Sequence, residues 1–447
     1  MRGWRSKGRR GSSPLFDTIK SELTQPFVPL SETDRAALQI RTLRVLVAGQ
    51  IAGAAALAAA VTVGAFVVQS ILGQNTPWGG IASATVTMGT AFMSQVLARV
   101  MVRRGRRGGL QMGYSLAIVG GLVAGLGVEL SSLWVFLGGL FLFGNGQASN
   151  LLSRYAATDL ALPNERSSAM SRILFASTFG AVFGPVLISP AERIGQELFG
   201  WRQYTGPWIF AAIFLLMSLL NTTLRLRHDP LEASGGLARQ SSDRVIRPKF
   251  SAIIRIVGQS SDARIALLSM VISQMTMVAV MTMTPVHLKA HGHEAVSAFV
   301  ISLHIAGMYA FSPLIGKFSD SRGRLATITV GGVLLICATL MAALARDQAT
   351  LLFPSLWLLG AGWSCGLIGG SSLLVDSVRG EQRVQVQGTA DLLMSFFGGL
   401  AGFASGFVRK AVGFSMLANI ASLLAAILLL AVVSRRLRQA NPSTIAA

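Results

Sequence analysis

The most chemically distinctive segment of this chain is the turn GKFSDSRGR at residues 316–324. It combines a carboxylate at Asp320 and a guanidinium at Arg324 with glycines at Gly316 and Gly323, and apolar stretches lie on both sides of it. A carboxylate at the N-terminus of a neighbouring helix is stabilised by about 0.3–1 kcal/mol. The turn is therefore a candidate contact between helices, although the same residues also suit a basic turn at a membrane surface.

Polar side chains inside apolar stretches form a second set of candidates. His304 lies within the apolar stretch ISLHIAGMY, and a histidine changes charge near neutral pH, so it is a candidate to carry a proton or to bind a ligand. The alternative is a neutral, hydrogen-bonded packing histidine. Further candidates for the wall of a cavity are Gln274, Arg154, Asn145, Gln147 and Trp363. Four methionines between residues 275 and 283 also suit a cavity, but we interpret most of them as packing residues.

Metal and nucleotide sites are not expected. The segment HLKAHGHE at residues 287–294 holds three histidines and a glutamate, which are suitable zinc ligands. However, Pro285 and Gly292 interrupt regular helix there, and no second ligand cluster accompanies it. The phosphate-binding pattern G-x-x-x-x-G-K-[ST] does not occur, which argues against an ATP-binding site of that type. We therefore expect no metal, no cofactor and no enzymatic activity.

The composition indicates which elements must hold these side chains. The chain has 447 residues, of which 52% are apolar and only 13% are charged, whereas a soluble domain has about 25% charged residues. A helix needs about 20 apolar residues to cross a bilayer, and many such stretches are present. We expect an all-α membrane protein with twelve transmembrane helices. The predicted spans lie near residues 43–71, 79–102, 109–127, 131–157, 168–190, 205–225, 264–286, 296–316, 324–345, 349–375, 387–408 and 412–433.

The positions of Lys and Arg predict the orientation of these spans. Of the 39 basic residues, the loops after odd-numbered spans hold only Arg193, Arg202, Lys289, Arg346, Arg409 and Lys410. The positive-inside rule then places both termini and the remaining loops in the cytoplasm. This distribution accounts for the net charge of +20, and because the bases are spread over many short loops, we expect no nucleic-acid partner.

The two halves of the chain share a weak internal repeat. Three pairs of matching features are separated by nearly the same number of residues. Gly105 matches Gly323 (218 residues), the pair Asp159 and Arg166 matches the pair Asp376 and Arg383 (217 residues), and Phe179-Gly180 matches Phe397-Gly398 (218 residues). Each match alone is weak, but the shared offset indicates a duplicated structure of the kind found in transporters.

The turn and its repeat resemble the loop signature of the major facilitator superfamily of transporters. The matching residues are Gly316, Asp320, Gly323 and Arg324 in the second half, and Gly105, Arg106 and Arg107 in the first half. Ala98 and Val102 stand where the signature has glycine and aspartate. The resemblance implies two pseudo-symmetric six-helix bundles around a central cavity, which rock between inward-open and outward-open states. It also implies that Asp320 has a gating role and faces the start of the fifth span, near Ser167 and Ser168.

A second resemblance concerns the fifth span. Its segment GAVFGP contains Gly180, Gly184 and Pro185 and is similar to the core of the glycine-proline motif in the superfamily's drug–proton antiporters. The glycines that usually follow are replaced by VLIS. This resemblance implies export.

The missing acid of the first-half turn leads to a prediction about Asp391. This residue lies in the first turn of the eleventh span, opposite the basic loop between the second and third spans. We predict that Asp391 pairs with Arg103 or Arg104 of that loop. The alternative is a solvated acid at a helix start. Similar ion pairs are expected among Asp159, Asp376, Arg166 and Arg383, while Arg154 either pairs or points into the cavity.

Together these features predict a secondary active transporter that uses a proton gradient to export small amphiphilic molecules. An importer of a small organic solute and a non-transporting membrane sensor are the alternatives. The expected organisation is a cytoplasmic tail (1–42), a helical bundle (43–225), a cytoplasmic linker (226–263), a second bundle (264–434) and a cytoplasmic tail (435–447). We expect a monomeric, multi-pass protein of the inner cell membrane whose partners are its substrate and the lipid bilayer.

Overall fold

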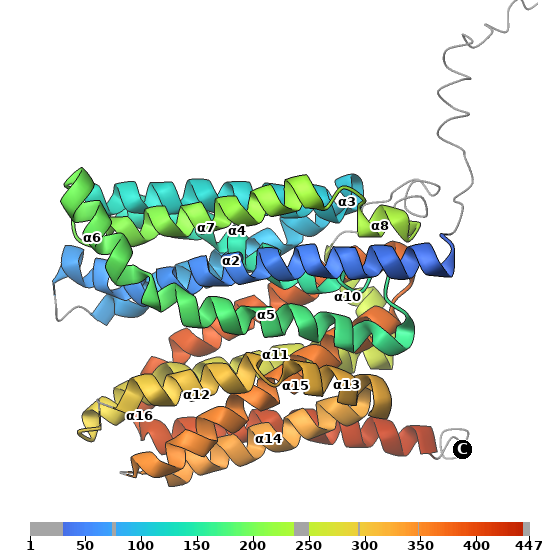
Figure 1. Cartoon of the computed structure of the whole chain (residues 1–447). Helices are drawn as coiled ribbons and strands as arrows, with labels where there is room; N and C mark the ends of the chain where they lie inside the picture. Colours follow the sequence, from blue (N-terminus) through green and yellow to red (C-terminus); the bar gives the residue numbers. More distant parts are fainter. Residues whose placement is uncertain (1–29, 74–76, 237–249, 294–295, 347, 441–447) are drawn as a thin grey trace, which may run out of the picture.

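Helices are the expected elements, because a bilayer offers an exposed backbone no hydrogen-bonding partners. The computed structural model describes residues 30–73, 77–236, 250–293, 296–346 and 348–440, and every regular element in these ranges is helical. The first half contains α2 (Glu32–Leu72), α3 (Ile81–Glu129), α4 (Leu133–Ala156), α5 (Arg166–Val186), α6 (Ile188–Phe199), α7 (Thr205–Arg225) and α8 (Pro230–Ala233). The second half contains α10 (Phe250–Gln259), α11 (Ser261–Ala290), α12 (Ser297–Tyr309), α13 (Ser312–Arg322), α14 (Arg324–Leu344), α15 (Leu352–Ser377) and α16 (Gly380–Ala440) (Figure 1).

Nine helices in the described part of the chain are long and apolar enough to cross a membrane. Three of them are much longer than one crossing requires, and two of these three, α3 and α16, contain an internal break. At about 1.5 Å per residue, the 49 residues of α3 and the 61 residues of α16 would far exceed a hydrocarbon core that is about 30 Å thick. Both helices are broken at a glycine with positive φ, namely Gly105 (φ 73°) and Gly413 (φ 87°), a conformation that other residues rarely adopt.

The predicted span at 296–316 corresponds to one candidate crossing, Ser297–Arg322, but its helix is interrupted. The chain instead forms α12 and α13, with a turn between Tyr309 and Ser312. Pro313 lies in the first turn of α13, where a proline is tolerated because its missing N–H would have no helical partner there.

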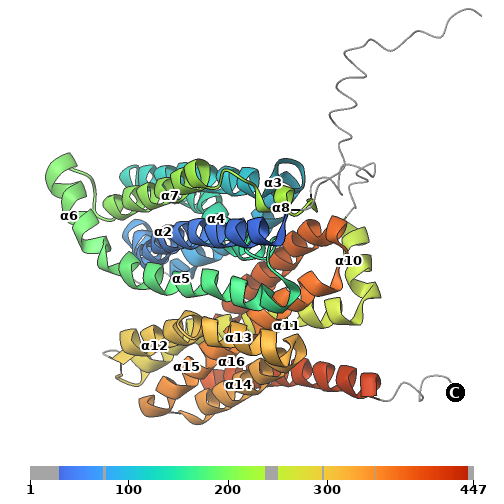
Figure 2. The same ribbon diagram turned by 45° about the vertical axis from the view of Figure 1, so that its right-hand side comes forward.

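The helices form two groups that pack side by side, α2–α8 and α10–α16 (Figures 1 and 2). Each group has its own apolar core: one is built mainly from residues 43–231 and the other mainly from residues 253–432. Leu151 and Leu174 of the first half belong to the core of the second, and Val375 and Val384 belong to the core of the first. The two halves therefore touch through buried apolar side chains as well as through the charged residues described below.

Candidate functional site

The turn at residues 316–324 contacts the other half of the molecule. Asp320, in the last turn of α13, accepts hydrogen bonds from the backbone N–H of Ser167 (3.1 Å) and Ser168 (2.8 Å), in the first turn of α5. The sequence predicted this position, and the carboxylate meets the positive end of the α5 dipole there. A Cβ at Gly316 would lie 2.7 Å from Cβ of Ser171, so Gly316 allows the close approach of α13 and α5. Gly323 has φ of 94° and separates α13 from α14.

Arg324 connects this contact to a second ion pair. Its guanidinium pairs with Asp320 (Nη1–Oδ1, 2.6 Å) and with Asp376 at the end of α15 (Nε–Oδ2, 3.1 Å). Asp376 also pairs with Arg166 of the first half (2.5 Å). Arg166 and Asp376 were predicted to take part in ion pairs. They pair with each other and thereby link the two halves.

The first-half copy of the turn uses Arg106. This buried side chain binds Asp159, three residues after the end of α4 (Nε–Oδ2, 2.8 Å; Nη2–Oδ1, 3.1 Å), and donates to Gln387 Oε1 on α16 of the second half (2.8 Å). Arg106 and Asp159 precede Arg324 and Asp376 by the repeat offset, so the two ion pairs are structural equivalents. Burial raises the pKa of the Asp159 carboxyl, and the Arg106 guanidinium opposes this shift.

Asp391 does not pair with Arg103 or Arg104, so this prediction is wrong. Both arginines are exposed. The break at Gly105 changes the direction of the chain, and the arginine that follows it, Arg106, points inward instead. The alternative of a solvated acid is also wrong, because Asp391 is 0% exposed.

The partner of Asp391 is Arg154 on α4. The pair joins the two halves at 2.5 Å (Nη2–Oδ1) and 3.4 Å (Nη1–Oδ2), with side chains that are 1% and 0% exposed. Arg154 also donates to Ser371 Oγ (3.2 Å), Leu151 O (2.5 Å) and the Tyr155 hydroxyl (3.2 Å). Every guanidinium nitrogen therefore has a partner, as a buried charge requires, and Arg154 does not open onto a cavity in this conformation.

An acid that the sequence did not predict binds the backbone of the first-half turn. Asp229 is 8% exposed and accepts from the backbone N–H of Arg107 (2.7 Å), two residues after the break at Gly105. It also caps α8 through the N–H of Leu231 (2.9 Å). An aspartate followed by proline is a sequence signal for a helix start, but it does not reveal the distant contact with Arg107.

The glycine-proline segment of α5 packs within the first half. A Cβ at Gly180 would lie 2.5 Å from Ala54 Cβ and 2.6 Å from Ile51 O on α2. Gly184 is buried, and Pro185 lies one residue before the end of α5. The segment thus allows close packing of α2 and α5 near the end of α5.

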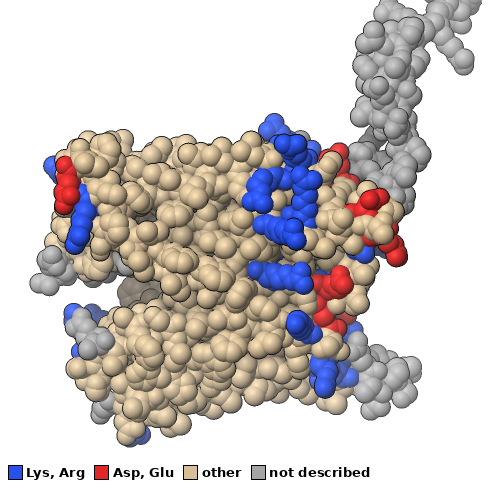
Figure 3. Space-filling view, viewed as in Figure 1, with Lys and Arg blue, Asp and Glu red and all other residues tan. Residues whose placement is uncertain are grey.

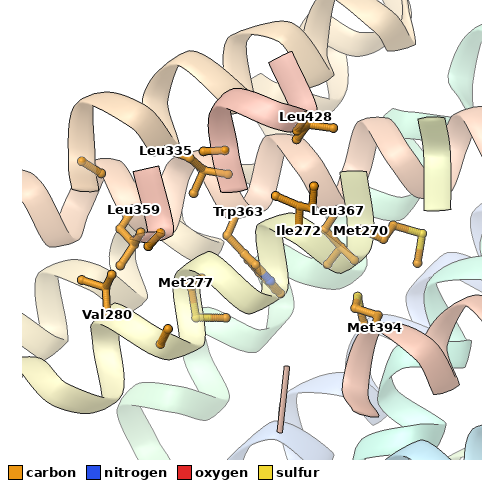
Figure 4. Close-up of a cluster of buried hydrophobic side chains, with 14 of the residues drawn as sticks. Met270, Ile272, Met277, Val280, Leu335, Leu359, Trp363, Leu367, Met394 and Leu428 are labelled. Atoms are coloured by element: carbon orange, nitrogen blue, oxygen red, sulfur yellow. The ribbon is translucent and has the colours of Figure 1, made fainter. Parts of the chain in front are cut away.

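The polar candidates inside the spans are mostly enclosed. His304 is 0% exposed, and its Nδ1 is 2.8 Å from Leu356 O, which agrees with the packing alternative. Trp363 donates from Nε1 to Gln274 Oε1 (2.6 Å) and lies in the apolar cluster with Met277 (Figure 4). Asn145 is 0% exposed, whereas Gln147 is half-buried.

The histidines before the eighth span are engaged in local contacts. His287 Nε2 is 2.7 Å from Arg346 O, and His291 Nδ1 is 2.8 Å from His287 O. Among the described residues, which exclude Glu294, no group of three or more His, Cys, Asp or Glu side chains is arranged to hold a metal ion.

The links between the halves lie near one end of the molecule. We call it the basic end and define it by the residues that join the halves there, namely Arg106, Arg154, Arg166 and Asp320. Lys and Arg gather there on the surface, and the molecule is hollowed between its halves at the opposite end (Figure 3). The structure is therefore closed at the basic end and open at the other.

Comparisons with known proteins agree with this architecture. The profile of the Major Facilitator Superfamily matches residues 45–403 and 266–446. The MFS-type transporter YdeG of Bacillus subtilis is 33% identical over 420 residues, covering 94% of this chain and 97% of its own. The riboflavin transporter RfnT of Brucella anthropi is 26% identical over 388 residues, covering 84% and 92%. The proton:xylose symporter XylE has a similar fold, with a TM-score of 0.69 at 15% identity over 89% of this chain and 95% of its own. The chain therefore belongs to the major facilitator superfamily and is a membrane-embedded transporter.

Proposed function

We propose that this protein is a proton-coupled secondary transporter that exports small amphiphilic molecules by alternating access. The observation that carries this proposal is the buried Arg154–Asp391 ion pair, which joins the two halves at the closed end. Neutralising only one partner of a buried ion pair is costly, because the other charge is then buried without a countercharge. Such a pair is therefore suited to a site where gain of a proton changes the conformation.

The proposal includes a topology of twelve crossings in two six-helix bundles. The nine spans become twelve when α3 and α16 are each divided at their glycine breaks and the 24-residue α4 is added. The positive-inside rule then assigns the basic end, with both termini, to the cytoplasm of a cell whose inner membrane holds the protein. In this orientation the structure represents the outward-open state.

Inward opening requires that the contacts at the basic end separate. Asp320 must leave the α5 amides, Arg106 must leave Gln387, and the ion pair of Asp391 must part. Protonation of Asp391 removes the negative charge that holds Arg154, so the remaining hydrogen bond is weaker. A proton taken up at Asp391 thus favours inward opening, and its loss favours closure.

Export is our first choice for the direction, because the Gly180–Pro185 segment is similar to the antiporter motif. Import of a small organic solute is the second candidate. The similarity to the riboflavin transporter RfnT supports a small organic solute as the substrate, since riboflavin is one. The fold is also shared with a proton symporter.

The decisive experiment reconstitutes the full chain into proteoliposomes with an imposed pH gradient. The substrates should include a lipophilic cation, riboflavin and xylose. Antiport predicts that substrate moves against the proton flow, and symport predicts the opposite. If a ligand binds but no gradient drives its flux, the proposal of transport is wrong and the sensor alternative gains support.

A further inference from the structure

An apolar groove opens on the second half of the molecule, away from the contacts between the halves. It lies where α10 packs against α11 and α16, near the basic end (Figure 2), and its volume is about 320 Å³. Sites for small molecules begin at about 300 Å³. The walls come from α10 (Ile254, Val257 and Gly258), α11 (Arg264, Leu267, Leu268 and Val271) and α16 (Leu393 and Phe397). None of these residues takes part in the proposed transport mechanism.

The groove has the shape and the chemistry of a site for a hydrocarbon chain. The wall residues of α11 recur at the spacing of one helix face, so they form a stripe about 10 Å long at about 1.5 Å per residue. Leu393 and Phe397 are about one helical turn apart on α16 and form another apolar wall. Arg264 is the one charged residue that lines the groove, and it stands at the end of the stripe, in the first turn of α11. A ligand that follows the stripe therefore has an apolar body and a polar end.

The described part of the chain does not fill this groove with a side chain of its own. A Cβ added at Gly258 would meet no atom within 4 Å, although glycine inside a helix is destabilising relative to alanine. The groove does not arise from a loosely attached helix, because Ile253 and Val257 are 1% and 5% exposed and hold α10 against the core of the second half. The missing side chain at Gly258 thus keeps room for a ligand.

The surface around the groove faces lipid. Apolar side chains that are exposed continue from it along α16, at Phe397, Leu400 and Phe403. On α10 the exposed side chains of Ile254 and Arg255 give the helix both apolar and basic surface, as in helices that lie at a membrane surface. Because the chain is embedded in a membrane, exposed apolar surface of this kind is covered by lipid. The occupant that the surroundings supply is therefore an acyl chain.

Arg264 determines which lipid head group suits the site. Among the described residues no acidic side chain pairs with it, and Asp262, in the same turn, pairs with Arg435 (3.1 Å). The N-terminal end of the α11 dipole adds partial positive charge at the same place. An anionic head group is therefore favoured over a zwitterionic one.

We propose that this groove binds one acyl chain of an anionic phospholipid, whose head group meets Arg264 at the membrane surface. The bound chain joins α10 to α11 and α16 through apolar contacts. The inference depends on the membrane location of the chain and not on its substrate or direction of transport.

The test uses phosphatidylglycerol with a photoreactive diazirine in one acyl chain, in proteoliposomes that contain the full chain. After photolysis, peptide mass spectrometry locates the lipid adducts. We expect the adducts to be concentrated at residues 267–271 and 393–397. Phosphatidylcholine with the same label should give about tenfold fewer adducts there, because a contact with a charged group corresponds to about a tenfold change in affinity.

Variants separate a specific site from general contact with lipid. Gly258→Phe should block the groove and abolish most of the labelling of these two segments. Gly138→Phe is the matched control, because Gly138 is also helical and exposed and has no atom within 4 Å of an added Cβ, but it lies on α4. Arg264→Gln should lower the labelling by phosphatidylglycerol to the level of phosphatidylcholine, whereas Arg103→Gln, at an exposed arginine of the first half, should not.

Circular dichroism checks that each variant is folded. Labelling that is spread evenly over the helices of the wild type, or that Gly258→Phe leaves unchanged, would overturn the proposal. Equal labelling by the two lipids would overturn the assignment to an anionic lipid. If both segments carry no adduct, the groove has an occupant other than lipid and the proposal is wrong.

Discussion

Replacement of Asp391 by asparagine should destabilise the conformation in which the basic end is closed. The variant leaves the Arg154 guanidinium buried at 1% exposure without its countercharge. Removal of one partner from a buried pair costs about 3–5 kcal/mol. Because asparagine keeps one acceptor oxygen, we expect the lower value. At about 1.36 kcal/mol per factor of ten, the ratio of closed to open conformers should fall about 150-fold.

A disulfide between the halves can report this change. Ser167 Oγ and Ser319 Oγ are 2.9 Å apart across the interface, so Ser167→Cys and Ser319→Cys should cross-link only when the basic end is closed. The native Cys337 and Cys365 must first be replaced, because Cys337 is exposed. We expect rapid oxidation in this background and slow oxidation when Asp391→Asn is added.

Two controls define the result. Asp262 pairs with Arg435 inside the second half (3.1 Å), so Asp262→Asn should leave the oxidation rate unchanged. The double variant Arg154→Met, Asp391→Leu removes both charges and should restore much of the closed population, as uncharged replacements often do for buried pairs. If Asp391→Asn oxidises as fast as the parent, the ion pair does not hold the gate and our reasoning is refuted.

Three further outcomes are expected. Asp320→Asn loses charge-assisted bonds to two α5 amides, so it should destabilise the closed state by about 1.5–3 kcal/mol; an unchanged cross-linking rate would contradict this. Gly316→Ala should slow cross-linking, because its Cβ would meet α5, whereas Gly258→Ala, with no atom within 4 Å, should not; equal effects would argue against a steric cause. His304→Gln should lower thermal stability but keep the pH profile of transport, because the ring is fully buried and bound to a backbone carbonyl. Loss of that pH profile would identify His304 as the proton carrier.

Local sequence features predicted the helices and the turns of this protein, because both depend on neighbouring residues along the chain. Long apolar stretches indicated helices because the bilayer leaves the backbone no other partner. Glycines at 105 and 323 indicated the turns because both need positive φ. The contact of Asp320 with the start of α5 also agreed with the expectation, since it follows from a family signature that Gly316, Gly323 and Arg324 complete.

The tertiary structure decided which distant charges meet. Arg154 and Asp391 are 237 residues apart, and nothing in their local sequence shows that their helix faces oppose each other. Arg106 is buried, whereas Arg103 and Arg104 are exposed, because the break at Gly105 redirects the chain and changes the face on which the following side chains lie. His304 was distinctive in sequence as a titratable residue in an apolar stretch, but only the packing of α12 against α15 shows that it is enclosed. Burial and pairing are properties of the assembled helices, because each depends on side chains supplied by another part of the chain.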